Sequence, residues 1–317
     1  MLRMKTYSDE EILLIKKSLK KFQNFYMENN ADAIKNLVFT VLGLFTSLAA
    51  MKKTLVGVPI GAAFFLRLFL VFHDACHHNF FKITHEQFLK KDGANKILAK
   101  CLEPFVGYSY ETWSKLHGQH HSVSGNANEL DWSRTVITLE EYNSMHPILR
   151  IIYKILRSPP IFFSIAPLVL FWIKNIINPS IVAKYIAFMF IMNKMGISVK
   201  RVFFAQYFAA MIGVMLFHLQ HTINEPYLVA CETEMEKDRA QLHSASILEI
   251  PQFLKWITMG IEYHHIHHIC PRIAGYNLQK AHEENAEIFK KTKKVSMKEA
   301  YENLRNTLYD EKNNRFL

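Results

Sequence analysis

Residues 54–78 read TLVGVPIGAAFFLRLFLVFHDACHH, an apolar run followed directly by a cluster of histidines. Between residues 54 and 72 the only charged side chain is that of Arg67, and the run is close to the ~20 residues that a helix needs to cross a bilayer. Arg67 is expected to snorkel to the interface or to face the bundle. The preceding stretch, 37–50, carries no charge. Together they predict a transmembrane hairpin with spans at about 33–51 and 54–72.

A later apolar block runs from residue 159 to residue 217, with polar interruptions at 174–179 and 193–201. Its first part, about 158–175, is short and contains three prolines, so we expect it to lie in the interface or to re-enter the membrane partway. The remainder predicts a second hairpin, with spans at about 181–197 and 201–217. The expected fold is therefore an all-α integral membrane protein with two transmembrane hairpins, about four spans.

The segments outside these blocks are strongly charged. Residues 1–32 are expected to contain an amphipathic helix that opens at a capping box of Ser8 and Glu11. Residues 286–317 mix basic and acidic side chains and predict a helical tail. The formal net charge of +10 fits a basic cytosolic face better than nucleic-acid binding, because the sequence contains no recognition motif. The four cysteines show no paired spacing and are expected to be reduced thiols.

Histidines carry the strongest chemical signal in the chain. Separations of three and four residues place side chains on one face of a helix. Crowded imidazoles would repel one another when protonated. Their clustering is therefore best explained by metal binding, in which neutral imidazoles act as ligands. Twelve of the 16 histidines fall into four clusters with this spacing: His73, His77 and His78; His117, His120 and His121; His218 and His221; His264, His265, His267 and His268.

The number of histidines indicates two metal ions, because a single zinc takes about four ligands and at least eight aligned imidazoles are present. Imidazole suits zinc, copper, iron and nickel alike, so ligand type leaves the metal open. A two-zinc hydrolase would normally use bridging carboxylates, but only Asp74 and Glu262 adjoin the clusters. These two are expected to accept hydrogen bonds from ligand imidazoles.

The order of spans and clusters places the expected metal site on one side of the membrane. An even number of crossings separates the second cluster from the third, so all four clusters face the same side, which we expect to be the cytosol. The predicted architecture is thus a membrane bundle capped by a cytosolic helical domain that holds a histidine-rich di-metal site. Such a site above apolar walls suits oxidation of a lipid chain.

At this point the sequence resembles the membrane fatty acid desaturases of the acyl-lipid type. The family pattern of HxxxH, HxxHH and a final HxxHH is present in order, and the segments 72–81 and 264–278 and the pair Gln220-His221 are also similar. The resemblance covers roughly residues 64–285 and implies a desaturase domain over 33–285. It implies a non-haem di-iron centre bound by His73, His77, His117, His120, His121, His221, His264, His267 and His268.

The resemblance also implies the reaction. Reduced iron binds O2, and two hydrogens leave adjacent carbons of a buried acyl chain, giving a cis double bond and water. Because no donor domain is visible in the chain, the electrons are expected from a separate protein, such as ferredoxin or cytochrome b5, that docks on the basic cytosolic face.

Several residues depart from the family pattern or stand outside it. His78 can replace or supplement His77 as a ligand. His218 is expected to be an interfacial histidine or to lie beside the ligands, and His265 is expected beside the ligands, but both stay candidate metal ligands. Trp113 is expected to anchor its helix at the interface. Tyr276 and Asn277 either orient the last histidine box, contact a lipid head group or simply pack the loop. The isolated histidines are expected to be structural: His85, His146, His243 and His282.

Two other functions stay open on these residues. A hydroxylase or ketolase acting on a lipid or carotenoid would use the same ligands, since oxygen rebound follows the same hydrogen abstraction. A metal transporter or metal-binding membrane protein would instead place histidines within the spans to line a path. Double-bond position, acyl carrier and oligomeric state stay open as well.

Overall fold

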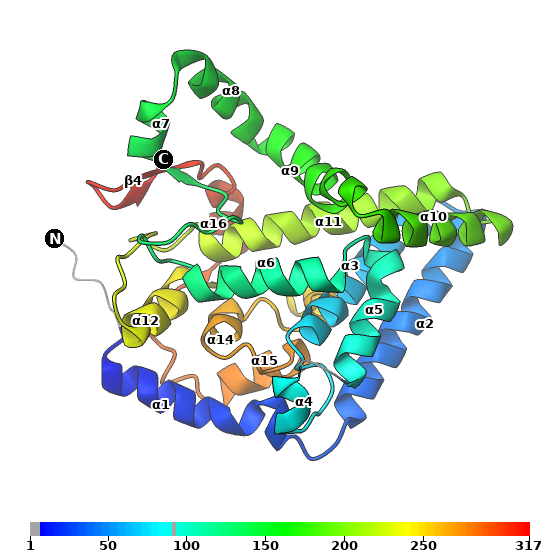
Figure 1. Cartoon of the computed structure of the whole chain (residues 1–317), viewed down its shortest axis with the longest axis horizontal. Helices are drawn as coiled ribbons and strands as arrows, with labels where there is room; N and C mark the ends of the chain where they lie inside the picture. The colour runs from blue at the N-terminus through cyan, green and yellow to red at the C-terminus, as the bar shows by residue number, and fades with distance from the viewer. Residues whose placement is uncertain (1–6, 91–92) are drawn as a thin grey trace.

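Long apolar helices form one side of the molecule, and mostly shorter helices form the other (Figure 1). The computed structural model describes residues 7–90 and 93–317. Within these residues, four helical segments are long and apolar enough to cross a membrane: Ala31–Lys53 (α2), Gly57–Cys76 (α3), Pro159–Ile177 and Val199–His221 (α11). The predicted all-α membrane fold is confirmed.

The first hairpin forms as predicted, with α2 packed along α3. Arg67 on α3 faces the bundle and is 4% exposed. Its Nε donates a hydrogen bond to Thr40 Oγ1 at 2.9 Å, and its guanidinium also donates to the Asn36 side chain and the Trp256 carbonyl. Because a buried cation in an apolar region is costly unless it is paired with acceptors, these bonds fix α2 and α3 to the segment that precedes the last histidines.

The second apolar block differs from the prediction in how its helices are divided. Pro159–Leu168 (α9) continues through a π-helical turn, Val169–Ile173 (η3), and a 3₁₀ turn, Lys174–Ile177 (η4), giving one segment of 19 residues. In contrast, Pro179–Lys194 (α10) has only 16 residues, fewer than the ~20 needed to span.

The prolines explain this difference. Pro159 and Pro160 occupy the first helical positions, where their missing N–H groups would have no helical partner in any case. Pro167 lies inside the helix and has no backbone N–H to donate. The helix continues after it through a π turn, in which the backbone hydrogen bonds span five residues. Pro159–Ile177 and α11 still make an even number of crossings between the second and third histidine clusters, so the one-sided arrangement of the clusters stays a prediction.

Between the hairpins, the chain forms two helices, of which sequence analysis expected only the one that carries Trp113 and the second histidine cluster. Ala94–Val106 (α5) packs back along α3 and ends at Gly107, whose φ of 68° suits a residue without a Cβ. Tyr110–Val123 (α6) begins at Ser109, whose side chain accepts a hydrogen bond from the Thr112 N–H. This helix carries the second histidine cluster across the bundle (Figure 1).

The N-terminal helix Asp9–Leu19 (α1) forms with its predicted capping box, and the part of the expected unit at 1–6 lies outside the described residues. Its apolar face is buried, and Lys16 pairs with Asp238 of Glu234–Ser244 (α12). The other short helices are His85–Leu89 (α4), Leu139–Ser144 (α7), Pro147–Arg157 (α8), Lys255–Thr258 (α13), His264–Ile269 (α14) and Gly275–Glu283 (α15).

The C-terminal segment differs from the helical tail that was expected. It contains one helix, Met297–Asn303 (α16), and three short strands, Lys294–Val295 (β3), Leu308–Asp310 (β4) and Arg315–Phe316 (β5). These strands pair with each other or with distant segments: β3 with Ile247–Leu248 (β2), and β4 with both β5 and Ile137–Thr138 (β1). Tertiary pairing therefore overrides the local charge pattern.

Candidate metal centre

Five of the predicted ligands converge in one place. His73 and His77 come from the end of α3, His117 and His121 from α6, and His267 from α14. One ring nitrogen of each lies within 4.8 Å of one from every other member. We call this the five-histidine group.

A second group lies directly beside the first. His120 of α6, His221 of α11 and His268 of α14 also bring ring nitrogens within 4.8 Å of one another. We call this the three-histidine group. His264 lies against it, with its Nε2 2.9 Å from His221 Nε2 and 3.1 Å from His268 Nε2. The structure therefore brings all nine predicted ligands together.

Helical spacing explains how each HxxHH motif serves both groups. Adjacent residues on a helix point about 100° apart. His120 and His121 therefore diverge, one toward each group, and His267 and His268 do the same on α14. In contrast, His117 and His121 are four residues apart, lie on one face and join the same group.

The spacing of the ring nitrogens fits metal ions. His73 Nε2 lies 2.8 Å from His117 Nε2, which lies 3.2 Å from His121 Nε2. Two nitrogens that each lie about 2.1 Å from one ion, at a right angle, are about 3.0 Å apart. The neighbouring groups accordingly have the spacing and the number of donors that two ions would require.

Several of these nitrogens are also buried without a hydrogen-bond partner among the described residues. They include Nε2 of His77, Nε2 of His120 and both ring nitrogens of His267. A buried polar atom without a partner costs about 1–3 kcal/mol, so a fold rarely keeps several side by side. A metal ion would take up the free lone pairs.

Burial also keeps these imidazoles in the form that binds metal. Loss of contact with water, followed by repulsion from neighbouring imidazoles, holds the pKa of His117, His121 and His267 well below the usual value. The pKa values of His264 and His268 are lowered for the same reasons. Neutral imidazole is the ligand form, so these side chains need not lose a proton when a metal binds near neutral pH.

Asp74 supports the first cluster from outside the groups. Its Oδ1 lies 3.1 Å from His73 Nδ1, and its Oδ2 accepts a hydrogen bond of 2.6 Å from the Gly275 N–H. A Cβ at Gly275 would lie 2.7 Å from the Met259 carbonyl oxygen, so this close approach requires glycine. The carboxylate thereby orients His73 and ties α3 to α15.

A second carboxylate with this role was missed by sequence analysis. Asp131 Oδ2 lies 2.7 Å from His120 Nδ1, and Ser133 Oγ lies 3.0 Å from the same nitrogen. Burial by itself would raise the pKa of Asp131, but hydrogen bonding with His120 and Ser133 outweighs it and lowers this pKa to about 2. Asp131 lies in a loop without helical spacing to any histidine, so only the tertiary structure identifies it.

The remaining candidates lie outside both groups. His78 Nε2 is 2.9 Å from the Tyr110 hydroxyl, and His218 Nδ1 is 2.9 Å from Thr135 Oγ1. Two further candidates have partners of their own: His265 Nε2 lies 3.2 Å from His282 Nδ1, and Glu262 accepts a hydrogen bond from Thr258 Oγ1 at 2.6 Å.

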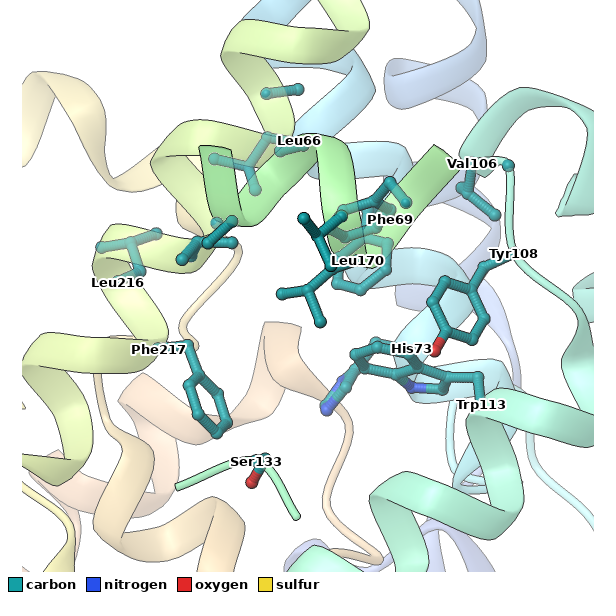
Figure 2. A pocket seen from close by; sticks show the side chains of 18 of the residues that line it. Leu66, Phe69, His73, Val106, Tyr108, Trp113, Ser133, Leu170, Leu216 and Phe217 are labelled. Atoms are coloured by element: carbon teal, nitrogen blue, oxygen red, sulfur yellow. The ribbon is translucent and has the colours of Figure 1, made fainter. Parts of the chain in front are cut away.

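An apolar cavity of about 470 Å³ opens onto the histidines. Its lining includes His73, His117, His120 and His264, and Trp113, which stacks on His117 with ring centroids 5.1 Å apart. Trp113 therefore contacts the site. The sequence predicts only that it anchors its helix at the membrane interface. Figure 2 shows the apolar walls around the open space: Leu66, Phe69, Leu170, Leu216 and Phe217.

The cavity extends away from the histidines along α11. Gly213 and then Gln206 line it at increasing distance from His221, and Gln206 lies roughly 22 Å away along the helix axis at 1.5 Å per residue. At that end the Tyr185 hydroxyl donates to Gln206 Oε1 at 2.9 Å, and Gln206 Nε2 donates to the Phe105 carbonyl at 2.7 Å. This polar bridge joins α5, α10 and α11.

Comparison with known proteins identifies the group to which this site belongs. The sequence model of the family described as Fatty acid desaturase matches residues 53–300, most of the chain and every histidine of the two groups. The chain belongs to the fatty acid desaturase family. A protein of Bacillus subtilis (strain 168) named Fatty acid desaturase is 29% identical over 282 residues, which cover 83% of this chain and 77% of that protein.

Membership of the fatty acid desaturase family agrees with the function predicted from the histidine boxes. The chain is an oxidoreductase that acts on fatty acids, and its substrate is a lipid. The four apolar helical segments fit the membrane association of this family.

Proposed function

We propose that this desaturase is an O2-dependent di-iron enzyme that introduces a cis double bond into a membrane-derived acyl chain. The observation that carries the proposal is the junction of the two histidine groups with an apolar cavity. His73 and His117 belong to the five-histidine group and also line that cavity, as does His120 of the three-histidine group. A chain in the cavity would therefore pass directly beside both groups.

In the proposal, the five-histidine group holds one iron ion, and the three-histidine group with His264 holds the other. Bound iron would supply the oxidising chemistry, in which O2 takes up two hydrogens from adjacent carbons together with two external electrons and two protons, giving two molecules of water. The donor set supports iron over a hydrolytic zinc pair, because neither group includes a carboxylate among the described residues.

The side chains of the cavity bind and orient the substrate. Phe69, Leu170 and Phe217 provide apolar contacts that favour an acyl chain and exclude water from the reacting carbons. The cationic residues of the lining are Arg134, Arg157 and Lys174, and the polar end of the substrate would remain beside a cation of this set. The methyl end would then extend toward Gln206.

Electrons would come from a separate donor protein, such as ferredoxin or cytochrome b5, that docks on the basic cytosolic face. This orientation rests on the even number of crossings between histidine clusters and on the net charge of +10. A metal transporter is a weaker alternative, because the histidines form two compact groups instead of a path along the spans.

The proposal is tested by the fatty-acid profile of a host that expresses the protein, compared with a host expressing His117→Ala. Gas chromatography with double-bond location should show new cis-unsaturated chains only with the unmodified protein, and metal analysis should show two irons per chain. Hydroxylated lipid as the sole product would overturn the dehydrogenation, and an iron-free active protein would overturn the di-iron centre.

A further inference from the structure

Helix α8, Pro147–Arg157, exposes apolar side chains that the protein does not cover. None of its eleven residues, all of them described, is buried. The exposed fractions of its apolar side chains reach 61% at Ile151. The exposed set consists of Ile148, Leu149, Ile151, Ile152, Ile155 and Leu156.

These six residues form one continuous face. At 100° per residue they occupy an arc of about 160°. Arg150, Lys154 and Arg157 occupy the opposite side, and the helix contains no acidic residue. The result is a strongly amphipathic helix, the kind that in a water-soluble protein turns its apolar face to the core.

In this protein, the packing of α8 is reversed. Tyr153, from the polar side, donates a hydrogen bond of 2.6 Å to the Thr307 carbonyl, and its ring lies 5.8 Å from that of Tyr142. The polar edge therefore contacts the protein, and the apolar arc faces outward. Figure 1 shows α8 at the periphery, on the far side of α9 from the rest of the bundle.

The neighbours of α8 indicate what covers the apolar arc. Ser158 ends α8 and begins the apolar segment Pro159–Ile177, so the arc continues into the surface of a candidate span. Leu156 and Arg157 also line the cavity. A lipid bilayer matches both features, because its acyl region accepts isoleucine and leucine while its phosphates attract cations.

We propose that α8 lies in the headgroup layer of the membrane, with its apolar arc among the acyl chains and with Arg150 available to lipid phosphates. This contact holds the part of the cavity that Leu156 and Arg157 line at the membrane surface, where an acyl chain could enter without crossing water. The proposal concerns the membrane surface of the protein and does not depend on which reaction the metal centre performs.

The test places a nitroxide label on α8 of the full-length protein. In a Cys101→Ser background, which removes the exposed native cysteine, a single cysteine replaces Ile151, Ile155 or Arg150. The proteins are reconstituted into phosphatidylcholine and phosphatidylglycerol vesicles, and collision rates with O2 and a water-soluble nickel chelate are measured. The background protein without a new cysteine gives the residual labelling of its buried thiols.

The label at Ile151 or Ile155 should meet O2 more often than the nickel chelate, as should a lipid control, Leu42→Cys on the exposed face of α2. The label at Arg150 should show the reverse preference, as should a water control, Glu234→Cys on α12, whose side chain is 90% exposed. Nickel access at Ile151 equal to that at Glu234 would overturn the proposal. Immobilisation at Ile151 with shielding from both reagents would also overturn it, because a protein such as a second copy would then cover the arc.

Discussion

The orientation of a ligand histidine depends on the partner of the ring nitrogen that does not face the metal position. His73 and His120 have carboxylates beside Nδ1, from Asp74 and Asp131, which leave Nε2 to face the neighbouring imidazoles. Such contacts fix the tautomer and the ring direction, and they raise the basicity of the ligand. A ligand imidazole is therefore defined by its outer contact as well as by its position in a motif.

Replacing a ligand should have a different effect from replacing a structural histidine. His267→Ala should reduce bound iron and abolish turnover, because His267 contributes to the five-histidine group. His243→Ala should leave both intact, since His243 belongs to neither group. Iron content and product formation, measured on purified proteins, check this pair, and full activity in His267→Ala would contradict the ligand assignment.

Asp131 provides a test of the outer contacts. Asp131→Ala should weaken iron binding by roughly 10–100-fold, because His120 loses the acceptor that orients it. Ser133→Ala should have a smaller effect, since the carboxylate remains. Iron titration followed by absorbance and metal analysis measures the affinity. An unchanged affinity in Asp131→Ala would show that His120 is held by packing alone.

At the scale of elements, two short helices distribute ligands between two metal positions. Helices α6 and α14 each place neighbouring histidines in different groups, while α3 and α11 supply the others. The same long helices form the walls of the cavity, so the positions of the metals and of the chain are set by one framework. Changes in the part of α11 that lines the cavity away from His221 should therefore alter chain selection without altering metal binding.

The polar bridge at the far end of the cavity should limit the length of the bound chain. Gln206→Ala removes the side chain that links Tyr185 to Phe105, and it should shift products toward longer chains. Gly213→Leu adds bulk nearer the histidines and should shift them toward shorter chains. Chain-length profiles by gas chromatography measure both shifts.

Phe204→Leu is the matched control for this pair, because Phe204 lies on the same helix with its side chain 50% exposed. All three variants should bind normal amounts of iron. Equal chain-length profiles in the three would show that the bridge does not contact substrate.

At the scale of the whole molecule, the metal centre joins segments that lie far apart in the chain. The nine histidines come from four helices, α3, α6, α11 and α14, and one of them, His77, directly follows the last residue of α3. Arg67 adds a connection between α2, α3 and the residues before α14. A bound metal would therefore stabilise the folded arrangement over any state in which these segments separate.

Removing the metal should lower thermal stability. A ligand present at 1,000 times its dissociation constant stabilises the folded state by about 4 kcal/mol, so chelation should reduce Tm by several degrees. Thermal unfolding in detergent, before chelation, after chelation and after iron is restored, measures the effect. An identical Tm in all three samples would indicate a preformed centre that does not bind iron.

The sequence by itself determined the membrane fold, the first hairpin and the helical faces of the histidine boxes, because these depend on apolar length and on separations of three or four residues. The helices in the second apolar block and at the C-terminus were divided differently: the block is continued through a π turn after Pro167, and the C-terminal strands depend on pairing with distant segments. Only the tertiary structure brought Asp131 to His120, directed His78 to Tyr110 and left the apolar arc of α8 uncovered. Local periodicity fixes which side chains share a face, whereas packing decides what that face meets.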